Sequence, residues 1–413
     1  MIKSRPLWLL LIFNTLVFAQ WQAIGPYGGY VRSVVVSSTN DNVVYAGSNG
    51  SPAIIAKSTN GGSSWNTVGS IPNSIYCMAI DPTNDNRLYA GSGHYLYRST
   101  DGGVNWLGIS MSNKYIYGIA VHPSISSTIY ASGMSYTGTK WGIAFFKSTD
   151  YGVNWTTTVM DTSGSSNYGY CIAVDRTNPN NIYVGGFSYT SSYIPRIYKT
   201  TNGGSNWVDV STDTLFNNAY YIYSMAVHPT NSNIVYAGTY LKGIFRSTNG
   251  GLSWTKNSSN YYNYSMATTP ASPNIAYCGG YNEVYKTTDA GATWFSASSG
   301  LDGYYIYGLA VSQTNGSIVY VGNNKGMYKT TSGGTSWNNI TNNLNMGQIL
   351  SFANAPSSPS TIYTSFAEVG VFKTTNSGTN WVQLPTPVGC GNICEFAVAY
   401  NNPNIVYALE GSG

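Results

Sequence analysis

A nine-residue segment that ends in tryptophan recurs along the whole chain. The first copy is "KSTNGGSSW" (57–65), and seven related segments follow, the last being "KTTNSGTNW" (373–381). Successive tryptophans of these segments lie 40 to 52 residues apart. A unit of this length predicts a repeat architecture, in which each unit buries its apolar face against its neighbours.

Each repeat carries a second signature upstream of the nonapeptide. In "MAVHPTNSNIVYAGT" (225–239) an apolar run, a polar turn and a β-branched run that ends in tyrosine predict a hairpin. A third strand such as "GMYKTT" (326–331) precedes the nonapeptide, and the tryptophan opens a fourth. Four short strands per repeat, without helical periodicity, predict an all-β fold: a β-propeller of four-stranded antiparallel blades, ordered from the axis outward.

Counting the two signatures gives eight complete repeats and a partial ninth, "FAVAYNNPNIVYALE" (396–410). We therefore expect one propeller over residues 20–413, with a closing blade that is incomplete in this chain. At the other end "WQAIGP" (21–26) has the pattern of an outermost strand, so strands from both ends could share one blade and protect its edges. That blade would have three strands, and we favour the alternative that the sequence is a fragment of a longer chain.

Residues 1–19 have the pattern of a secretory signal peptide. Lys3 and Arg5 precede an apolar run over 8–18, which is too short to span a membrane, and Ala19 fits the cleavage rule. An uncleaved anchor is the alternative. No later run is long enough to insert into a membrane, so we expect a secreted bacterial protein, extracellular or at the cell surface.

The charge pattern argues against nucleic acid as a partner. Only 8% of residues are charged, and removing Lys3 and Arg5 lowers the net charge from +4 to +2 (17 basic minus 15 acidic residues). Phosphate binding needs clustered lysine or arginine, and the sequence has no such cluster. Cys390 and Cys394 could close a small disulfide loop, and no spacing predicts a metal site or a cofactor.

The residue types of the nonapeptide predict a structural turn. Asp or Asn accepts hydrogen bonds from turn amides, glycine supplies positive φ, and the tryptophan fills the space between sheets. A catalytic or calcium-binding loop would need the acid, yet four copies have Asn and one has Ser at this position. The structural residues that we predict are Asn60, Trp65, Asp101, Trp106, Asp150, Trp155, Asn202, Trp207, Asn249, Trp254, Asp289, Trp294, Ser332, Trp337, Asn376 and Trp381.

This pattern, Ser/Thr-x-Asp/Asn-x-Gly-x-x-Trp, resembles the Asp-box or BNR repeat, and the resemblance covers residues 21–413. Sialidases, sortilin-type receptors, xyloglucanase-like glycoside hydrolases and photosystem II assembly factors carry it. The segment "WQAIGPYGGYVRSVVV" (21–36) is also similar to secreted bacterial propellers that are loosely described as sialidase-like. The resemblance implies a β-propeller whose box turns lie on the face opposite the binding site.

Pairs of tyrosines begin the innermost strand of most repeats, as in "YIY" (115–117) and "YGY" (168–170). Because alternate residues of a strand point to the same side, both tyrosines of a pair should face one way and form a partial ring around the axis. The second tyrosine could pack between blades, whereas the first lies nearer the loops and is the better candidate for ligand contact. The candidate ligand-binding residues in this group are Tyr115, Tyr168, Tyr221, Tyr262 and Tyr305.

Two connections between the second and third strands of a repeat, 132–146 and 185–198, are longer than the others and rich in aromatic residues. They belong to consecutive blades, so their side chains should cluster and form a binding site, unless the loops are only decorative. The candidates here are Tyr136, Trp141, Tyr189, Tyr193 and Arg196.

Catalysis is not favoured by the sequence. A glycoside hydrolase needs two carboxylates across the scissile bond, and the acids expected on the loop face are scattered over different repeats. These acids are Asp161, Asp213, Asp302, Glu283, Glu368 and Glu395. We expect a non-catalytic propeller that binds polysaccharide or an extracellular protein. The alternatives are a glycoside hydrolase of the xyloglucanase-like type and an adhesion or assembly scaffold without a small ligand.

Overall fold

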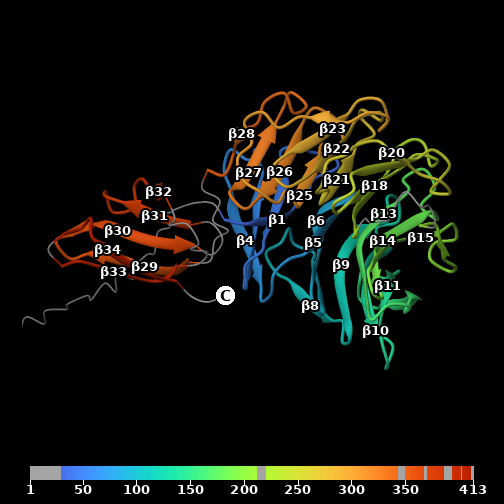
Figure 1. The fold of residues 1–413 in the computed structure, drawn as a ribbon, viewed down its shortest axis with the longest axis horizontal. Coiled ribbons are helices and arrows are strands. Elements are labelled where there is room, and N and C mark those ends of the chain that lie inside the picture. Colours follow the sequence, from blue (N-terminus) through green and yellow to red (C-terminus); the bar gives the residue numbers. More distant parts are fainter. Residues whose placement is uncertain are drawn as a thin grey trace, which may run out of the picture.

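The computed structural model describes residues 29–211, 220–342, 349–366, 370–385, 393–400 and 402–410. Within these ranges the chain is all-β, with antiparallel sheets and no helix (Figure 1). Eight sheets have four strands and the ninth has two. The predicted fold class, eight complete repeats and a partial ninth, is confirmed.

We number the first seven four-stranded sheets as blades 1 to 7. Blades 1 and 2 comprise β1 (Val31–Val36), β2 (Val44–Ser48), β3 (Ala53–Ser58), β4 (Asn66–Ile71), β5 (Cys77–Asp81), β6 (Asn84–Ser92), β7 (Tyr95–Ser99) and β8 (Leu107–Ser110). Blades 3 and 4 comprise β9 (Lys114–Val121), β10 (Ile129–Tyr136), β11 (Trp141–Ser148), β12 (Thr156–Asp161), β13 (Ser166–Val174), β14 (Ile182–Tyr189), β15 (Tyr193–Thr200) and β16 (Val208–Asp209).

The remaining strands follow the same meander. Blades 5 to 7 comprise β17 (Ile222–Val227), β18 (Val235–Thr239), β19 (Ile244–Ser247), β20 (Thr255–Lys256), β21 (Ser265–Thr268), β22 (Ala276–Gly279), β23 (Val284–Thr287), β24 (Phe295–Ser296), β25 (Gly308–Val311), β26 (Val319–Asn323), β27 (Gly326–Thr330) and β28 (Asn338–Asn339). The last two sheets comprise β29 (Ile349–Ala355), β30 (Ser358–Phe366), β31 (Gly370–Thr374), β32 (Val382–Leu384), β33 (Ile393–Val398) and β34 (Val406–Glu410).

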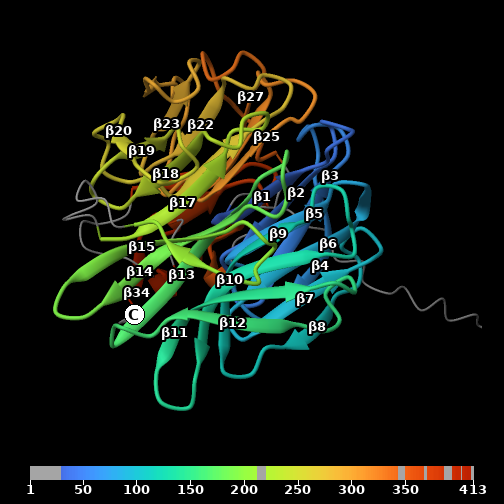
Figure 2. The same cartoon turned by 90° about the vertical axis from the view of Figure 1, so that its right-hand side faces the viewer.

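The seven blades surround a common axis, as Figure 2 shows. Their first strands, β1, β5, β9, β13, β17, β21 and β25, contact one another in sequence, and β25 contacts β1. The second strand of a blade is covered on both faces by its neighbours, so β2, β18 and β26 are buried along their whole length. This burial explains the unbroken apolar and small-residue runs of the type "VYAGS".

The ring closes through side chains that join blade 1 to blade 7. The Trp65 indole Nε1 donates a hydrogen bond to the carbonyl of Ile340 at 2.9 Å, and the Tyr320 hydroxyl donates to the carbonyl of Asp41 at 2.8 Å. Trp65 and Tyr320 are buried in one hydrophobic cluster with Val31 and Met327. Blades 1 and 7, which meet where the ring closes, each have four strands of their own. Closure therefore does not require that one blade combine strands from both ends of the chain.

The last two sheets lie to one side of the ring in Figure 1 and have a hydrophobic cluster of their own, which includes Tyr363, Val371 and Phe396. This arrangement differs from the single propeller expected over residues 20–413. The angle at which blades pack decides how many of them complete a circle, and near-identical repeats do not encode that number visibly. The segments 1–19 and 21–26, interpreted above as a signal peptide and an outermost strand, lie outside the described residues.

The nonapeptide forms the turn between the third and fourth strands. In blade 1 the Ser58 hydroxyl accepts a hydrogen bond from the Gly62 amide at 2.8 Å, and Asn60 Oδ1 accepts one from the Ser64 amide at 2.9 Å. Asp101 Oδ1 accepts the equivalent amide hydrogen bond in blade 2, also at 2.9 Å. An amide oxygen therefore replaces a carboxylate oxygen without loss of this contact, in agreement with the exchange of Asp for Asn among the repeats.

Candidate functional site

Seven equivalent positions, one on each blade, line the axis and form an inner ring. They are Arg32, Tyr76, Tyr117, Tyr170, Tyr223, Tyr264 and Tyr307. On blades 1, 3, 4 and 5 the strand register shifts at this residue, and on the other three it directly precedes the first strand. A bulge leaves one residue unpaired and re-aims its side chain, which explains how the side chains on these four blades turn towards the axis.

The rings of the inner tyrosines contact one another around the axis. Tyr170 and Tyr223 stack with centroids 4.8 Å apart and planes 4° apart, and Tyr264 and Tyr307 have centroids 4.6 Å apart. The Arg32 guanidinium lies over the Tyr307 ring, 3.6 Å from its centroid. The ring is thus a continuous series of aromatic contacts that a single cation interrupts.

These side chains enclose an axial cavity of about 210 Å³. Its described lining consists of the seven inner-ring residues and Tyr168. Burial raises the pKa of Tyr223 to about 12, and it also raises the pKa values of Tyr117 and Tyr170. The phenols therefore remain protonated at neutral pH and are able to donate hydrogen bonds into the cavity.

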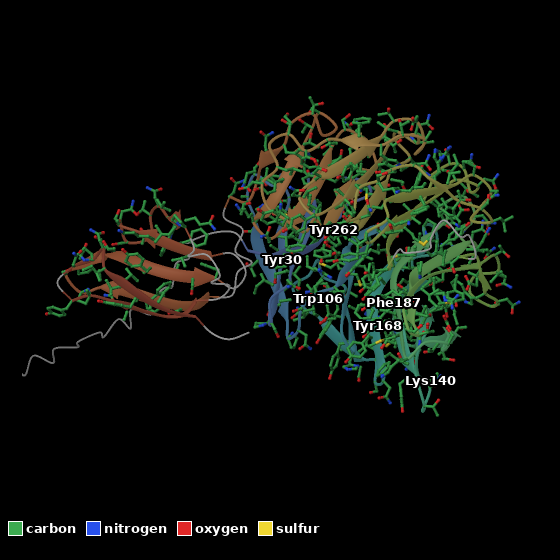
Figure 3. The ribbon with its side chains drawn as sticks, viewed as in Figure 1. Tyr30, Trp106, Lys140, Tyr168, Phe187 and Tyr262 are labelled. Carbon is green, nitrogen blue, oxygen red and sulfur yellow. The ribbon has the colours of Figure 1, made fainter. Side chains whose placement is uncertain are left out.

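A second ring lies nearer the loops and forms the mouth of the cavity. Its members, two residues before the inner-ring positions, are Tyr30, Tyr115, Tyr168, Tyr221, Tyr262 and Tyr305, with Ser74 on blade 2. The two tyrosines of each pair lie side by side, with centroids 5.7 Å apart for Tyr168 and Tyr170. Figure 3 labels three members from separate blades, Tyr30, Tyr168 and Tyr262. Tyr305 has a φ of 57°, a backbone conformation that residues other than glycine rarely adopt.

Glycines on the second strands allow the mouth tyrosines to approach closely. A Cβ atom on Gly186 would lie 1.7 Å from the backbone oxygen of Tyr168, and one on Gly133 would lie 1.7 Å from that of Tyr115. Only a residue without a side chain fits at either position. The small residues in the second strands are therefore part of what places the aromatic mouth.

The two long connections are hairpins rather than irregular loops. Strands β10 and β11 pair as far as Tyr136 and Trp141, and β14 and β15 pair as far as Tyr189 and Tyr193. Their aromatic side chains extend the mouth at two places. The Trp141 ring lies 5.5 Å from Tyr115, the Tyr193 ring lies 5.0 Å from Tyr221, and both distances join ring centroids.

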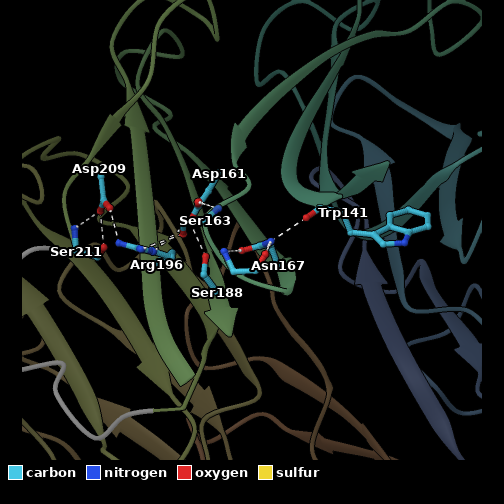
Figure 4. A network of polar contacts seen from close by, with 9 residues as sticks. Trp141, Asp161, Ser163, Asn167, Ser188, Arg196, Asp209 and Ser211 are labelled. Carbon is cyan, nitrogen blue, oxygen red and sulfur yellow. Dashed lines mark hydrogen bonds and ion pairs between the residues drawn. The ribbon is translucent and has the colours of Figure 1, made fainter. Parts of the chain in front are cut away.

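The five candidates on these hairpins do not form one cluster. Tyr136 contacts Trp141, and Tyr189 contacts Tyr193, but among the described ring contacts none joins one pair to the other. The first hairpin is instead fixed by β13 of the next blade, because the Asn167 side-chain amide donates a hydrogen bond to the carbonyl of Trp141 at 2.8 Å (Figure 4).

Arg196 lies away from the mouth in a network of polar contacts (Figure 4). Its Nε is 3.2 Å from Asp161 Oδ2, and its Nη1 is 3.0 Å from Asp209 Oδ2. Burial would raise the pKa of Asp161, but hydrogen bonds from Ser188 and Ser163 together with Arg196 hold it below its ordinary value. Two carboxylates thus already satisfy this arginine, so it fixes the junction of blades 3 and 4.

Each candidate carboxylate whose side chain is described has a partner. The pairs are Asp161 with Arg196, Asp302 with Lys325, and Glu283 with the Tyr285 hydroxyl. None of these acids lines the axial cavity within the described residues. The other three candidates, Asp213, Glu368 and the side chain of Glu395, lie outside the described residues, as do Cys390 and the side chain of Cys394.

A family profile described as the DUF6242 beta propeller domain matches residues 28–277, which is more than half of the chain. The chain belongs to the DUF6242 beta propeller family. The match supports the predicted β-propeller fold, and its description names no activity. Among curated proteins, none matches the sequence significantly. The described residues contain no helix that is long and apolar enough to cross a membrane.

Solved structures with a similar fold include GH74 enzymes and YCF48 bound to a peptide. An ancestral GH74 enzyme matches with a TM-score of 0.71 at 20% identity, over 95% of this chain and 60% of its own. The GH74 xyloglucanase from Xanthomonas campestris matches with a TM-score of 0.65 at 14% identity, over 92% and 71%. YCF48 bound to D1 peptide matches with a TM-score of 0.52 at 14% identity, over 74% and 94%. These identities establish the fold alone, and the DUF6242 chain spans about 60% of the ancestral enzyme's length.

Sequence reasoning missed the blade 1 members of both rings in this DUF6242 propeller. Tyr30 and Arg32 occur in "YVRSVVV" (30–36), which aligns with "YIYSMAV" (221–227) if arginine is allowed at the second aromatic position. A search for paired tyrosines passes over this segment. The inner tyrosines, for which packing between blades was the alternative, contact their neighbours and also line the cavity.

Raising the pH from 10 to 12 is expected to destabilise this DUF6242 propeller. The pKa of Tyr223 is about 12 in the folded protein and 10.0 in the reference state, so between these values the folded state binds more protons than the unfolded state. The stabilising contribution is fully present below pH 10 and is lost as the pH rises towards 12. Melting temperatures at successive pH values, recorded with tyrosinate absorbance, measure it; melting that stays constant up to pH 12 would contradict the expectation.

Proposed function

We propose that this propeller is a secreted, non-catalytic module that binds polysaccharide at the aromatic mouth of its axial cavity. The observation that carries the proposal is that the inner ring and the mouth ring lie one above the other along the axis. In each of them, tyrosines from six blades surround one opening. Concave sites lined by aromatic side chains with a few convergent polar groups are the usual binding sites of proteins.

Tyrosine has the two properties that a sugar ligand requires. Its ring offers an apolar face for the C–H face of a pyranose, and its hydroxyl forms hydrogen bonds with sugar hydroxyls. The mouth also remains partly accessible, since Tyr305 is 37% exposed. Because the hairpin tips hold Trp141 and Tyr193 beside the mouth ring, the binding surface extends beyond the cavity itself.

A glycoside hydrolase of the xyloglucanase-like type is the second candidate, and the GH74 structural neighbours favour it. Against it, Asp161 is paired with Arg196 and Asp302 with Lys325, which removes both from the role of a free acid or base. An assembly scaffold is the third candidate. Release of reducing sugar from a panel of polysaccharides would distinguish hydrolysis from binding. If no polysaccharide of the panel bound, the assembly scaffold would be the remaining candidate.

Replacing Tyr168 with alanine is expected to weaken binding of neutral oligosaccharides about three- to tenfold, because one stacking platform and one hydroxyl are lost from the mouth. Titration calorimetry on a glycan array hit measures the change. Tyr151→Ala is the matched control, since Tyr151 is 40% exposed but lies in a nonapeptide turn at the opposite end of the blades. Equal losses in the two variants would argue against the mouth as the binding site.

A further inference from the structure

One inner-ring position departs from tyrosine. Arg32 occupies on blade 1 the place that Tyr76, Tyr117 and their equivalents occupy on the other six blades. The other described residues that line the cavity are all tyrosines, a residue type that carries no charge at neutral pH, so Arg32 is the one basic or acidic side chain among them. An otherwise repetitive ring thus carries a single positive charge at its centre.

The described surroundings of Arg32 do not neutralise it. Its guanidinium stacks on Tyr307 at 3.6 Å, and its Nε is buried without a hydrogen-bond partner. The ion pairs found in the described residues involve Arg87, Arg196 and Lys325, and none involves Arg32. A half-buried guanidinium that lacks a carboxylate is costly unless something else supplies the negative charge.

The neighbouring groups suit an anion. Stacking on Tyr307 holds the planar guanidinium in place, and a fixed guanidinium pairs with a carboxylate through two parallel hydrogen bonds. Protonated phenols such as Tyr223 add donors and no competing charge. The volume of about 210 Å³ is of the size of one small ring or its substituent.

We propose that the axial cavity binds the carboxylate of a uronic acid at the end or on a branch of the polysaccharide, with Arg32 as the residue that selects the acid. The inference rests on the proposed function and deepens it. The mouth tyrosines bind sugar rings of either kind, while the inner ring distinguishes acidic from neutral sugars.

The test compares oligogalacturonate with its methyl ester, which differ in charge at the carboxyl group and little in shape. We expect the wild-type protein to bind the acid about tenfold or more tightly than the ester, since a charge-assisted pair is lost in the ester. This comparison needs no variant, so it holds even where a substitution at Arg32 impairs folding.

Arg32→Gln is expected to bind acid and ester equally, and to bind the ester as the wild type does. Arg32→Lys keeps the charge without the planar fork and should retain a reduced preference. Lys140→Gln is the control, because Lys140 is an exposed cation at the tip of the β10–β11 hairpin (Figure 3) and should leave the preference unchanged. Circular dichroism confirms that each variant is folded.

The outcomes separate the two proposals. Binding of the ester and the acid with equal affinity by the wild type, or an acid preference that survives in Arg32→Gln, would overturn the role of Arg32 and leave the sugar-binding function standing. Absence of binding to neutral and acidic sugars alike would overturn both. Capture of peptides through their C-terminal carboxylate, without any uronide, would assign the cavity to a protein partner and overturn the uronate.

Discussion

A chain that ends at Asn342, with the N-terminal part retained, is expected to fold into a closed ring and unfold cooperatively. A chain that ends at Gly300 is expected not to fold stably. The difference is blade 7, whose residues Tyr320, Met327 and Ile340 form one buried cluster with Val31 and Trp65 of blade 1. Leaving several such side chains without their partners costs about 2–5 kcal/mol each, and a whole domain is stable by only about 5–15 kcal/mol.

Far-ultraviolet circular dichroism and thermal melting of the two truncated chains measure the effect. The matched comparison is the full-length protein, which should show the melting transition of the Asn342 chain, since Tyr363, Val371 and Phe396 form a separate cluster in the last two sheets. If the Gly300 chain melted cooperatively at the same temperature as the Asn342 chain, contact between β25 and β1 would not be what stabilises the ring.

The repeat unit was predictable because its physics is local. Alternating residues, polar turns such as that after Val227, and the Gly-containing nonapeptide each specify a strand or turn within about ten residues. The number of blades in the ring is not local. Blade 7 and the eighth sheet both carry the nonapeptide, at 329–337 and 373–381, yet the circle closes after blade 7. That number depends on packing between β25 and β1, nearly 280 residues apart, which a repeat count does not contain.

The candidate site was predictable in part for the same reason. Period-2 alternation placed both tyrosines of a pair on one side, and Tyr168 and Tyr170 lie side by side as expected. Alternation does not predict a bulge, and the register shifts next to Tyr117, Tyr170 and Tyr223 are what aim the second residue at the axis. Arg32 was not recognised from the sequence as an inner-ring residue, because the equivalent position on the other six blades is tyrosine.

Arg196 shows the opposite error. An arginine beside aromatic residues on a long hairpin resembles a ligand contact, but Asp161 and Asp209 lie at the ends of strands that the sequence separates by 35 and 13 residues from it. Asp209 lies near Arg196 because β15 pairs with β16, and Asp161 lies near it because blades 3 and 4 pack together. Long-range pairing of this kind decides whether a charge is available to a ligand.

Replacing Trp65 with alanine is expected to lower the free energy of unfolding by about 3–5 kcal/mol, the second large effect. The Trp65 indole is only 2% exposed, and it joins blade 1 to Ile340 of blade 7 by packing and by a hydrogen bond of 2.9 Å. The substitution leaves a cavity at the closure and deprives the carbonyl of Ile340 of its donor. Denaturant unfolding monitored by circular dichroism measures the loss.

Trp106→Ala is the matched control, because Trp106 ends the next nonapeptide along the chain but does not lie at the closure. Its indole is half-buried and donates to the carbonyl of Gly103 in its own turn, at 2.8 Å. Trp106→Ala removes less buried apolar surface than Trp65→Ala and breaks no hydrogen bond between blades 1 and 7. The decrease in the free energy of unfolding should therefore be clearly smaller. Equal decreases would mean that Trp65 at the ring closure contributes no more to the free energy of unfolding than a tryptophan at another blade boundary.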